Sequence, residues 1–389
     1  MTTQSSDATP PPGRLHGGLR PHEHFWRDRQ VWLEEHGYML RPRYKPDWQP
    51  SWLGTSKSLL SCEDGLAIIT GGVLDATRIS DGAMVMLKKV DTDIHPYEVD
   101  LGHFLSSETM TSDPRNRCVR TLDVLPDPVE GNIKIIVLPL LRQFDDPDFA
   151  TVGEAVACLQ QVIEGLQFMH EQHVAHRDIS ILNVMMDGTP MYPDMWHPRV
   201  SIMKRDYSGR VKHYARTERP PKYYHIDFGL SRKYDPDNGP PRELPIFGGD
   251  KNVPEFQGDG YDKPADPFRT DIYYLGSFIR EGFLEVSVSP CFSAQHAHVC
   301  ALQPYCNMEF MRSFVADMVQ NDPESRPTIE EVASRSEKLF SQLASWNLRA
   351  RLVQRDENVL VRTVLGIKHI FRTARYLVKR LPAIPTPTY

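Results

Sequence analysis

The chain has few cysteines, and they form no pattern. Six cysteines are scattered through 389 residues, and no two have the C-x-x-C spacing of a metal or redox site. A small secreted domain that relies on disulfides would carry a far higher density. The composition therefore predicts a reducing compartment, either the cytosol or the nucleus.

Long apolar runs are equally scarce. No segment approaches the length of about 18 apolar residues that a transmembrane helix needs. The first residues, MTTQSSDATPPPG, have neither the basic start nor the apolar core of a secretory signal. We therefore expect a soluble protein.

A strong excess of charge of one sign is also missing. The formal net charge is -6 and the pI is about 6.2, so no overall electrostatic attraction favours nucleic acid. Aromatic residues interleaved with Arg and Lys at 24–59 could stack on single-stranded bases, but we favour their packing on the protein itself. No specific nucleic-acid partner is predicted.

The hydrophobic pattern of the first part of the chain changes twice. Residues 1–23 are rich in Ser, Thr, Pro and Gly and are predicted to be disordered, and the aromatic-rich extension 24–59 follows. Residues 60–141 are predicted to form a small, mostly antiparallel β region with one helix, because they contain short β-type runs at Ile68–Val73, Val85–Val90 and Ile133–Leu141 and a helical stretch at Glu98–Leu105.

The second part of the chain is predicted to be mostly helical. Residues 142–345 form this larger region, with helical spacing at 152–169, 272–283, 310–319 and 329–343. A long insertion at about 185–224 interrupts it, and residues 346–389 form a basic C-terminal tail. The expected fold class is α+β.

One polar loop stands out within the larger region. His176, Arg177, Asp178 and Asn183 lie within eight residues, and Asp227-Phe228-Gly229 follows after the insertion. A tight loop after a helix would place Asp178 and Asn183 on one rim, and a strand end would deliver Asp227 opposite. Asp178 would then orient a hydroxyl, while Asn183 and Asp227 hold magnesium.

These motifs and their order resemble the eukaryotic protein kinase family over about residues 60 to 345. Other landmarks in the same order are Val85-Met86-Leu87-Lys88, Val253-Pro254-Glu255, Asp271 and Asp322–Arg326. The resemblance implies a two-lobed fold, with a small β N-lobe and a larger α C-lobe, that uses ATP and Mg²⁺ on a protein substrate. The aromatic extension and the insertion also resemble the fungal-type, basidiomycete-expanded kinase-like group.

The resemblance assigns roles around the nucleotide. Lys88 would contact the α- and β-phosphates and pair with Glu98, although Asp100 and Glu108 stay open as alternatives. In the loop, Asp178 and Asn183 would be catalytic, and Asn183 and Asp227 would bind the metal. Four further residues would contact ATP: Pro139 and Leu141 at the hinge around adenine, and Gly71 and Gly72 near the phosphate turn.

Other matching residues have structural roles in the family. His176 would pack under Phe228, Asp271 would cap the backbone of the catalytic loop, and Glu255 would pair with Arg326. Arg177 would meet an acidic group of the activation segment. The candidates for that group are Asp235, Asp237, Glu243 and Asp250, so activity is expected without phosphorylation of this segment.

The sequence departs from the family at the glycine-rich loop and at the acceptor side. No G-x-G-x-x-G is present, and Ser180 stands where Ser/Thr-directed kinases carry a lysine. Residues 248–252 also lack the usual threonine, and Lys251 could replace the missing cation. The metal and ATP residues are therefore expected to be intact, while the acceptor side differs.

The C-terminal tail has a helical stripe of apolar residues. The stripe runs from Leu360 to Leu381, and basic residues such as Lys368 and Lys379 flank it. Three interpretations stay open: the helix lies on an anionic membrane surface, it pairs with a partner helix, or it docks on its own kinase lobe.

We expect an ATP- and Mg²⁺-dependent protein kinase that transfers the γ-phosphoryl group to a Ser or Thr hydroxyl. A pseudokinase scaffold and a kinase-fold phosphotransferase for a small molecule are the alternatives. The sequence names neither the substrate nor the oligomeric state.

Overall fold

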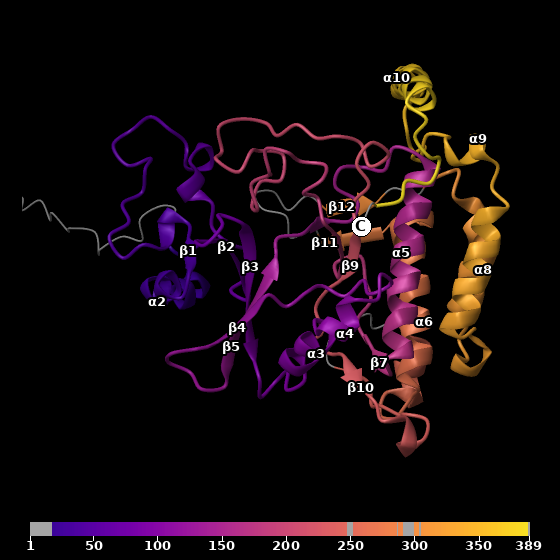
Figure 1. Cartoon of the computed structure of the whole chain (residues 1–389), viewed down its shortest axis with the longest axis horizontal. Coiled ribbons are helices and arrows are strands. Elements are labelled where there is room, and N and C mark those ends of the chain that lie inside the picture. Colours follow the sequence, from indigo (N-terminus) through magenta and orange to yellow (C-terminus); the bar gives the residue numbers. More distant parts are fainter. Residues whose placement is uncertain (1–17, 247–251, 286, 291–298, 303–304, 388–389) are drawn as a thin grey trace, which may run out of the picture.

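The computed structural model describes residues 18–246, 252–285, 287–290, 299–302 and 305–387. Figure 1 shows an antiparallel sheet on the N-terminal side and long helices on the C-terminal side. The helices are α1 His24–Arg27, α2 Gln30–Glu35, α3 Glu98–Leu105, α4 Glu108–Thr111, α5 Val152–Glu171, α6 Pro267–Ile279, α7 Arg312–Met318, α8 Ile329–Ser341, α9 Ser345–Leu348 and α10 Val359–Val378.

Five strands form the N-terminal sheet in the order β1-β2-β3-β5-β4, with every pair antiparallel. Its strands are β1 Tyr38–Leu40, β2 Val73–Arg78, β3 Met84–Asp91, β4 Asp123–Pro126 and β5 Ile133–Pro139. The other strands are β6 Arg142–Gln143, β7 Val174–Ala175, β8 Val184–Met186, β9 Tyr223–His225, β10 Arg232–Lys233, β11 Ser287–Pro290 and β12 Val299–Leu302.

The N-terminal extension is part of this sheet. It supplies the edge strand β1, in which Tyr38 pairs with Arg78 and Leu40 pairs with Ala76. Between Leu40 and Val73 the chain makes a long excursion that contains short 3₁₀ turns. A segment distant in sequence therefore completes the sheet, although the sequence pattern predicts that this segment belongs to a separate extension that ends at residue 59.

The aromatic side chains of the extension are core residues. Trp26, Tyr38 and Tyr44 are buried with Leu74 and Leu87, which project from one face of the sheet. The alternative of a base-stacking surface is therefore wrong for these rings, because burial withdraws their faces from any ligand.

Order begins before the predicted boundary at residue 23. The 3₁₀ turn Pro21–Glu23 ends in a carboxylate that is fully buried, and Arg43, also fully buried, pairs with it at 3.0 Å. Residues 1–17 of the predicted disordered segment lie outside the described residues.

The β-type run at Ile68–Val73 is a wrong prediction, since only Val73 belongs to a strand. Ile68 is buried as part of an irregular segment that packs under the extension. An apolar residue beside a turn can fill a core without forming strand hydrogen bonds, and periodicity does not separate the two cases.

Helices make up most of the C-terminal part. α5 is the long central helix; Thr151 caps its N-terminus by accepting a hydrogen bond from the Glu154 amide. Its buried face packs in one large core with α6, α7 and α8. The predicted helices at 152–169, 310–319 and 329–343 correspond to α5, α7 and α8, and the pattern at 272–283 corresponds to α6 and a following π turn, Arg280–Leu284.

The insertion at 185–224 crosses back to the N-terminal sheet (Figure 1). Arg205 donates to the Gly82 carbonyl at 3.0 Å and to the Thr77 hydroxyl at 2.9 Å, and the Tyr207 hydroxyl donates to the Leu60 carbonyl at 2.9 Å. These contacts tie a loop of the helical part to the turn between β2 and β3 and to the excursion that precedes β2.

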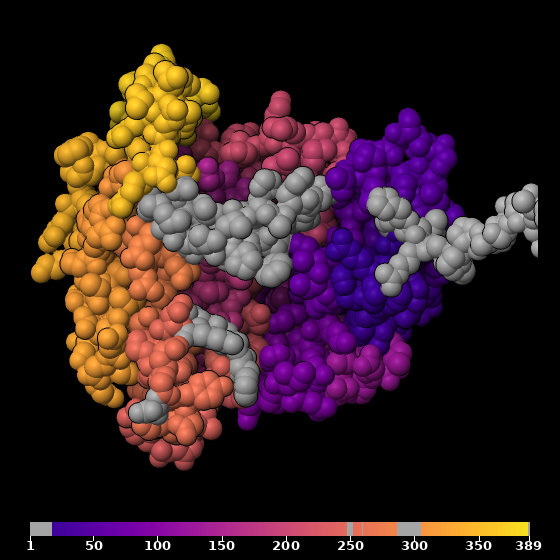
Figure 2. All heavy atoms as spheres, turned by 180° about the vertical axis from the view of Figure 1, so that it is seen from behind, coloured from indigo at the N-terminus to yellow at the C-terminus, as the bar shows by residue number. Residues whose placement is uncertain are grey.

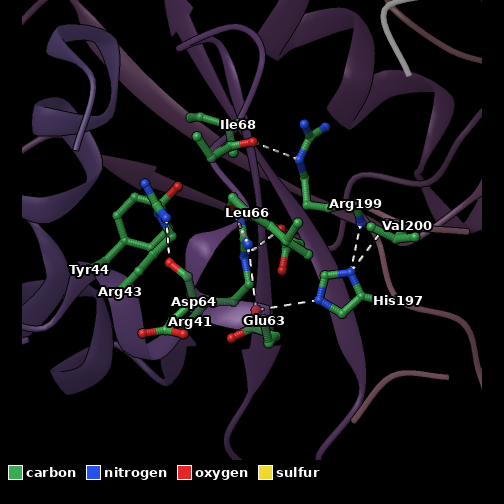
Figure 3. A network of polar contacts seen from close by, with 12 residues as sticks. Arg41, Arg43, Tyr44, Glu63, Asp64, Leu66, Ile68, His197, Arg199 and Val200 are labelled. Atoms are coloured by element: carbon green, nitrogen blue, oxygen red, sulfur yellow. Dashed lines mark hydrogen bonds and ion pairs between the residues drawn. The ribbon is translucent and has the colours of Figure 1, made fainter. Parts of the chain in front are cut away.

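A buried polar network reinforces this connection (Figure 3). In it, His197 lies 3.3 Å from Glu63, Arg199 donates to the Ala67 carbonyl at 3.1 Å, and Arg41 pairs with Asp75 at 3.2 Å. The insertion thus connects segments far apart in the sequence, since 134 positions separate Glu63 from His197.

Candidate active site

The polar loop after α5 is held from below by a buried carboxylate. Asp271 of α6 is fully buried and accepts 2.7 Å hydrogen bonds from the backbone N–H groups of His176 and Arg177. Arg177 has a φ of 66°, an uncommon conformation for a residue other than glycine. The predicted capping role of Asp271 is confirmed, and it explains how this turn is stabilised.

Two short strands bring the remaining polar residues of the motif together. β8 begins directly after Asn183 and pairs antiparallel with β9, which ends two residues before Asp227. The amide of Ile226 donates to the Asn183 carbonyl at 3.0 Å. Asn183 and Asp227 therefore lie at adjacent strand ends, although the insertion separates them in sequence.

Asn183 also holds Asp178. Its side-chain amide nitrogen donates to both the backbone carbonyl and the Oδ2 carboxylate oxygen of Asp178, each at 2.8 Å. Because the amide nitrogen faces Asp178, the amide oxygen of Asn183 points the other way. Asp178 and Asn183 thus form one rigid unit on the loop.

Lys88 connects the sheet to two carboxylates from other segments of the chain. Its Nζ contacts Glu98 Oε1 of α3 and lies 2.7 Å from Asp227 Oδ1. Asp100 and Glu108, the two alternatives to Glu98, are exposed to solvent. Glu98 is therefore the acidic residue of this helix region that pairs with Lys88.

Lys88, Glu98 and Asp227 form a trio in which burial and the neighbouring charges have opposite effects on the pKa values. Burial alone would lower the pKa of Lys88, but the negative charges of Asp227 and Glu98 outweigh it and raise that pKa. Burial would raise the pKa of Asp227, but the Lys88 ammonium outweighs it and lowers that pKa. Lys88 and Asp227 are therefore both ionised near neutral pH.

Gly229 leaves space for the trio. A Cβ at this position would lie 3.1 Å from His95 Nδ1, 3.2 Å from Glu98 Oε2 and 3.3 Å from Asp227 Oδ1. His95 also contacts the Gly229 carbonyl at 3.0 Å. Any side chain here would crowd the carboxylates that hold Lys88.

His176 has the predicted packing role. Its ring meets Phe228 edge-on with a centroid distance of 5.7 Å, and its Nε2 lies 3.1 Å from the Ile226 carbonyl. Burial lowers the pKa of this imidazole, so it stays neutral and packs as a core group.

Pro139 and Leu141 line a cavity of about 380 Å³ where β5 leaves the sheet. This volume falls within the range of roughly 300–1,000 Å³ typical of small-molecule sites. Met84 lies on the sheet side of the cavity, and Met195 and Arg205 of the insertion also line it. A smaller cavity of about 220 Å³ borders Val73, the strand partner of Lys88, and Arg199.

The two predicted phosphate-turn glycines differ in their surroundings. Gly71 packs against the backbone of His22, and its carbonyl accepts a 3.0 Å hydrogen bond from the Trp26 indole. Gly72 has open space around it and accepts from the Lys89 amide at 2.8 Å. Gly71 therefore anchors the extension, and only Gly72 borders open space.

The acceptor side of the loop carries no cation at Ser180. The Ser180 hydroxyl accepts from the Leu182 amide at 3.3 Å and so shapes the loop. Arg177 pairs with Glu243 at 3.5 Å, which identifies one of the four candidate acidic partners. Lys251 and Asp250 lie outside the described residues.

The donor set at Asn183 and Asp227 fits magnesium. Mg²⁺ is usually held by one or two protein oxygens together with substrate phosphates and water. Asp227 uses one carboxylate oxygen for Lys88, and its side chain is 45 % exposed. No group of three or more His, Cys, Asp or Glu residues suited to a metal occurs in the described part of the chain.

Similarity to known proteins supports a protein kinase. The Wee1-like protein kinase of Oryza sativa subsp. japonica is 29 % identical to this chain over 185 residues. The match covers 46 % of this chain and 28 % of that relative, so the chain spans less than a third of the relative's length. No family model matches the chain.

Several residues around the site were not predicted from the sequence. Asp75 of β2 pairs with Arg41, and Arg199 and Arg205 of the insertion line the cavities beside β2 and β3. Asp75 lies between Leu74 and Ala76 in the sequence, and this apolar surrounding could have flagged it, because a buried carboxylate needs a partner.

Proposed function

We propose that this protein is an ATP- and Mg²⁺-dependent protein kinase that phosphorylates Ser or Thr hydroxyls. In this proposal the N-terminal sheet with α3 is the small lobe, the helical part is the large lobe, and the cavity at Pro139–Leu141 receives adenine. The buried aromatic extension and the insertion are compatible with the fungal-type kinase-like group.

The contact of Lys88 with both Glu98 and Asp227 carries this proposal. The three residues come from β3, from α3 and from the segment after β9, which are separate elements that only the tertiary fold brings together. A structural ion pair would need one carboxylate for one lysine. A lysine between two carboxylates, one of them half-exposed, is arranged to exchange a partner for phosphate and metal charge.

Each residue then has a role in phosphoryl transfer. Lys88 holds the α- and β-phosphates, and Glu98 keeps its ammonium in place. Asp178 accepts a hydrogen bond from the acceptor hydroxyl and takes its proton as the new O–P bond forms, while the bond from the γ-phosphorus to the β,γ-bridging oxygen breaks and ADP leaves. Asn183 and Asp227 would hold magnesium, which would supply positive charge against the phosphates.

Three variants test the proposal. Radiolabel transfer from ATP to a panel of protein substrates is expected from the native chain and not from Lys88→Met or Asp178→Asn. Lys89→Met is the matched control, because Lys89 is the next residue and its ammonium lies 4.4 Å from the Phe25 ring centroid. Equal transfer by the native chain and Asp178→Asn would overturn the proposal.

A pseudokinase scaffold is the second candidate, favoured by the missing glycine-rich loop. A long excursion between β1 and β2 takes its place, and a buried ion pair joins Arg41 at its start to Asp75 of β2, just beyond its end. This candidate predicts Mg²⁺-dependent thermal stabilisation by ATP without transfer. Transfer to small hydroxyl compounds but not to proteins would instead identify a small-molecule phosphotransferase.

A further inference from the structure

The C-terminal helix α10 exposes a continuous apolar stripe. Leu360, Val364, Ile367, Phe371 and Val378 recur at helical spacing, and between 52 % and 84 % of each residue is exposed. Val359, Ile370 and Leu377 widen the stripe and are also exposed. This stripe therefore does not pack on the body of the protein, and the interpretation from sequence that the helix docks on the protein itself holds only for its other side.

The opposite side of α10 attaches the helix to the body. Tyr376 is 2 % exposed, and Arg372 donates to the Ala150 carbonyl at 3.3 Å. At 100° per residue, Tyr376 lies roughly opposite Ile367 and Phe371 around the helix. The helix is thus fixed in an orientation that turns its apolar stripe outward.

Two figures show that the helix is accessible. In Figure 1 α10 is seen end-on at the top edge of the molecule, beyond α5 and α9. In Figure 2 the same segment, in yellow, projects from the upper corner of the molecular surface. α10 therefore lies at the edge of the molecule in both views.

Charge is strongly segregated onto this helix. Residues 359–381 contain six Lys or Arg residues and no Asp or Glu, whereas the whole chain has a net charge of -6, so the remaining residues carry a net charge of -12. Arg375 and Lys379 both reach Glu218, at 2.7 and 3.2 Å, yet remain about half-exposed. One carboxylate cannot neutralise two cations, and Arg362, Lys368 and Arg380 are exposed as well.

We propose that α10 docks the protein on an anionic lipid membrane, lying in the plane of the surface with its apolar stripe among the acyl chains. The helix has the exposed large apolar residues, the basic flanks and the lack of acidic groups that such binding requires. None of the described helices is long and apolar enough to cross a membrane, so α10 would lie on the surface.

The charge distribution disfavours a second copy of the chain as the occupant. Two α10 helices packed stripe to stripe would bring twelve cations together without an acidic residue between 359 and 381 to pair with them. A membrane that contains phosphatidylserine supplies many negative charges in a plane, and each nearby Lys or Arg contributes roughly 1 kcal/mol to binding.

Vesicle sedimentation of the full chain tests the proposal. Vesicles of phosphatidylserine and phosphatidylcholine should sediment the native chain, whereas vesicles of phosphatidylcholine alone should bind at least tenfold less. Phe371→Glu should abolish binding, because it places a charge in the centre of the stripe. Val129→Glu is the matched control, since Val129 is an exposed apolar residue of similar accessibility in the loop between β4 and β5.

Three results would overturn the proposal: no binding to the mixed vesicles, equal binding to both kinds of vesicle, or unchanged binding by Phe371→Glu. Light scattering tests whether a second copy of the chain covers the stripe instead. If the native chain is a dimer, Phe371→Glu is a monomer and neither binds vesicles, the stripe serves self-association. The circular dichroism of each variant verifies that it is folded. No nucleotide is needed, so the outcome is independent of kinase activity.

Discussion

Lys88 Nζ lies 2.7 Å from Asp227 Oδ1 and also contacts Glu98, so one ammonium connects the N-terminal sheet, α3 and the segment after β9. Glu98 is nearly buried, whereas the Asp227 side chain is 45 % exposed. The buried partner is therefore suited to fix the lysine, and the more exposed one is suited to face a ligand.

Removing the charge of Glu98 should impair the site. We expect Glu98→Gln to reduce phosphoryl transfer by about 10- to 100-fold, since a hydrogen bond to a charged group contributes about 1.5–3 kcal/mol. Asp100→Asn, on the exposed side of the same helix, should change the rate less than about twofold. Steady-state rates of both variants test this, and equal losses would contradict the assignment of Glu98.

Adding a methyl group at Gly229 should displace the trio without unfolding the protein. A Cβ would lie 3.1–3.3 Å from His95, Glu98 and Asp227, a tighter approach than ordinary contact. We expect Gly229→Ala to weaken Mg²⁺-dependent ATP binding by at least about tenfold, which corresponds to about 1.4 kcal/mol. Gly131→Ala, in the loop between β4 and β5, is the control because nothing lies within 4 Å of its Cβ position, and calorimetry of both variants should separate them.

The buried pair of Glu255 and Arg326 should be a major stabilising contact of the helical part. Arg326 is buried, and its guanidinium donates to both carboxylate oxygens at 2.8 and 2.6 Å, as the sequence predicts. Arg326→Met should lower the free energy of unfolding by about 3–5 kcal/mol, because it leaves a carboxylate without its partner.

The matched control for that substitution is Arg242→Met. Arg242 and Glu324 are 3.6 Å apart and both mostly exposed, so this change should cost no more than about 1 kcal/mol. Denaturant titration of the two variants gives the comparison. Similar losses in both would show that burial does not strengthen the Glu255–Arg326 contact.

Acid should loosen the connection between the insertion and the sheet. Burial would raise the pKa of Glu63, but the hydrogen bond from His197 and the charge of Arg41 outweigh it and lower that pKa below its ordinary value of 4.5. A lowered folded-state pKa contributes stability that is complete above pH 4.5 and is lost as the pH falls through the lowered value.

Glu63→Gln should therefore lower the Tm at neutral pH and differ less from the native chain as the solution is acidified. Glu130→Gln is a suitable control, because the Glu130 carboxylate is half-exposed and contacts Arg29 only at the edge of the sheet. Scanning calorimetry across the acid range measures both curves. A constant Tm difference at every pH would contradict the role of Glu63.

Local sequence patterns predicted the elements around the site well. The run Val85–Val90, the stretch Glu98–Leu105 and the stripe in 152–169 correspond to β3, α3 and α5 because each is decided by neighbours in sequence. The run Ile68–Val73 failed for the opposite reason, since Ile68 is buried by the distant residues Trp26 and Tyr44.

The sequence by itself determined the chemical groups of the candidate site and the helices and strands that carry them, because capping, alternation and loop length act over a few residues. Only the tertiary structure decided that Tyr38–Leu40 completes the sheet, that Glu98 and not Asp100 meets Lys88, and that residues 197–207 connect back to the sheet. These contacts join segments far apart in the chain. Which residues pair depends on the burial and the charges that arise once the whole core has formed.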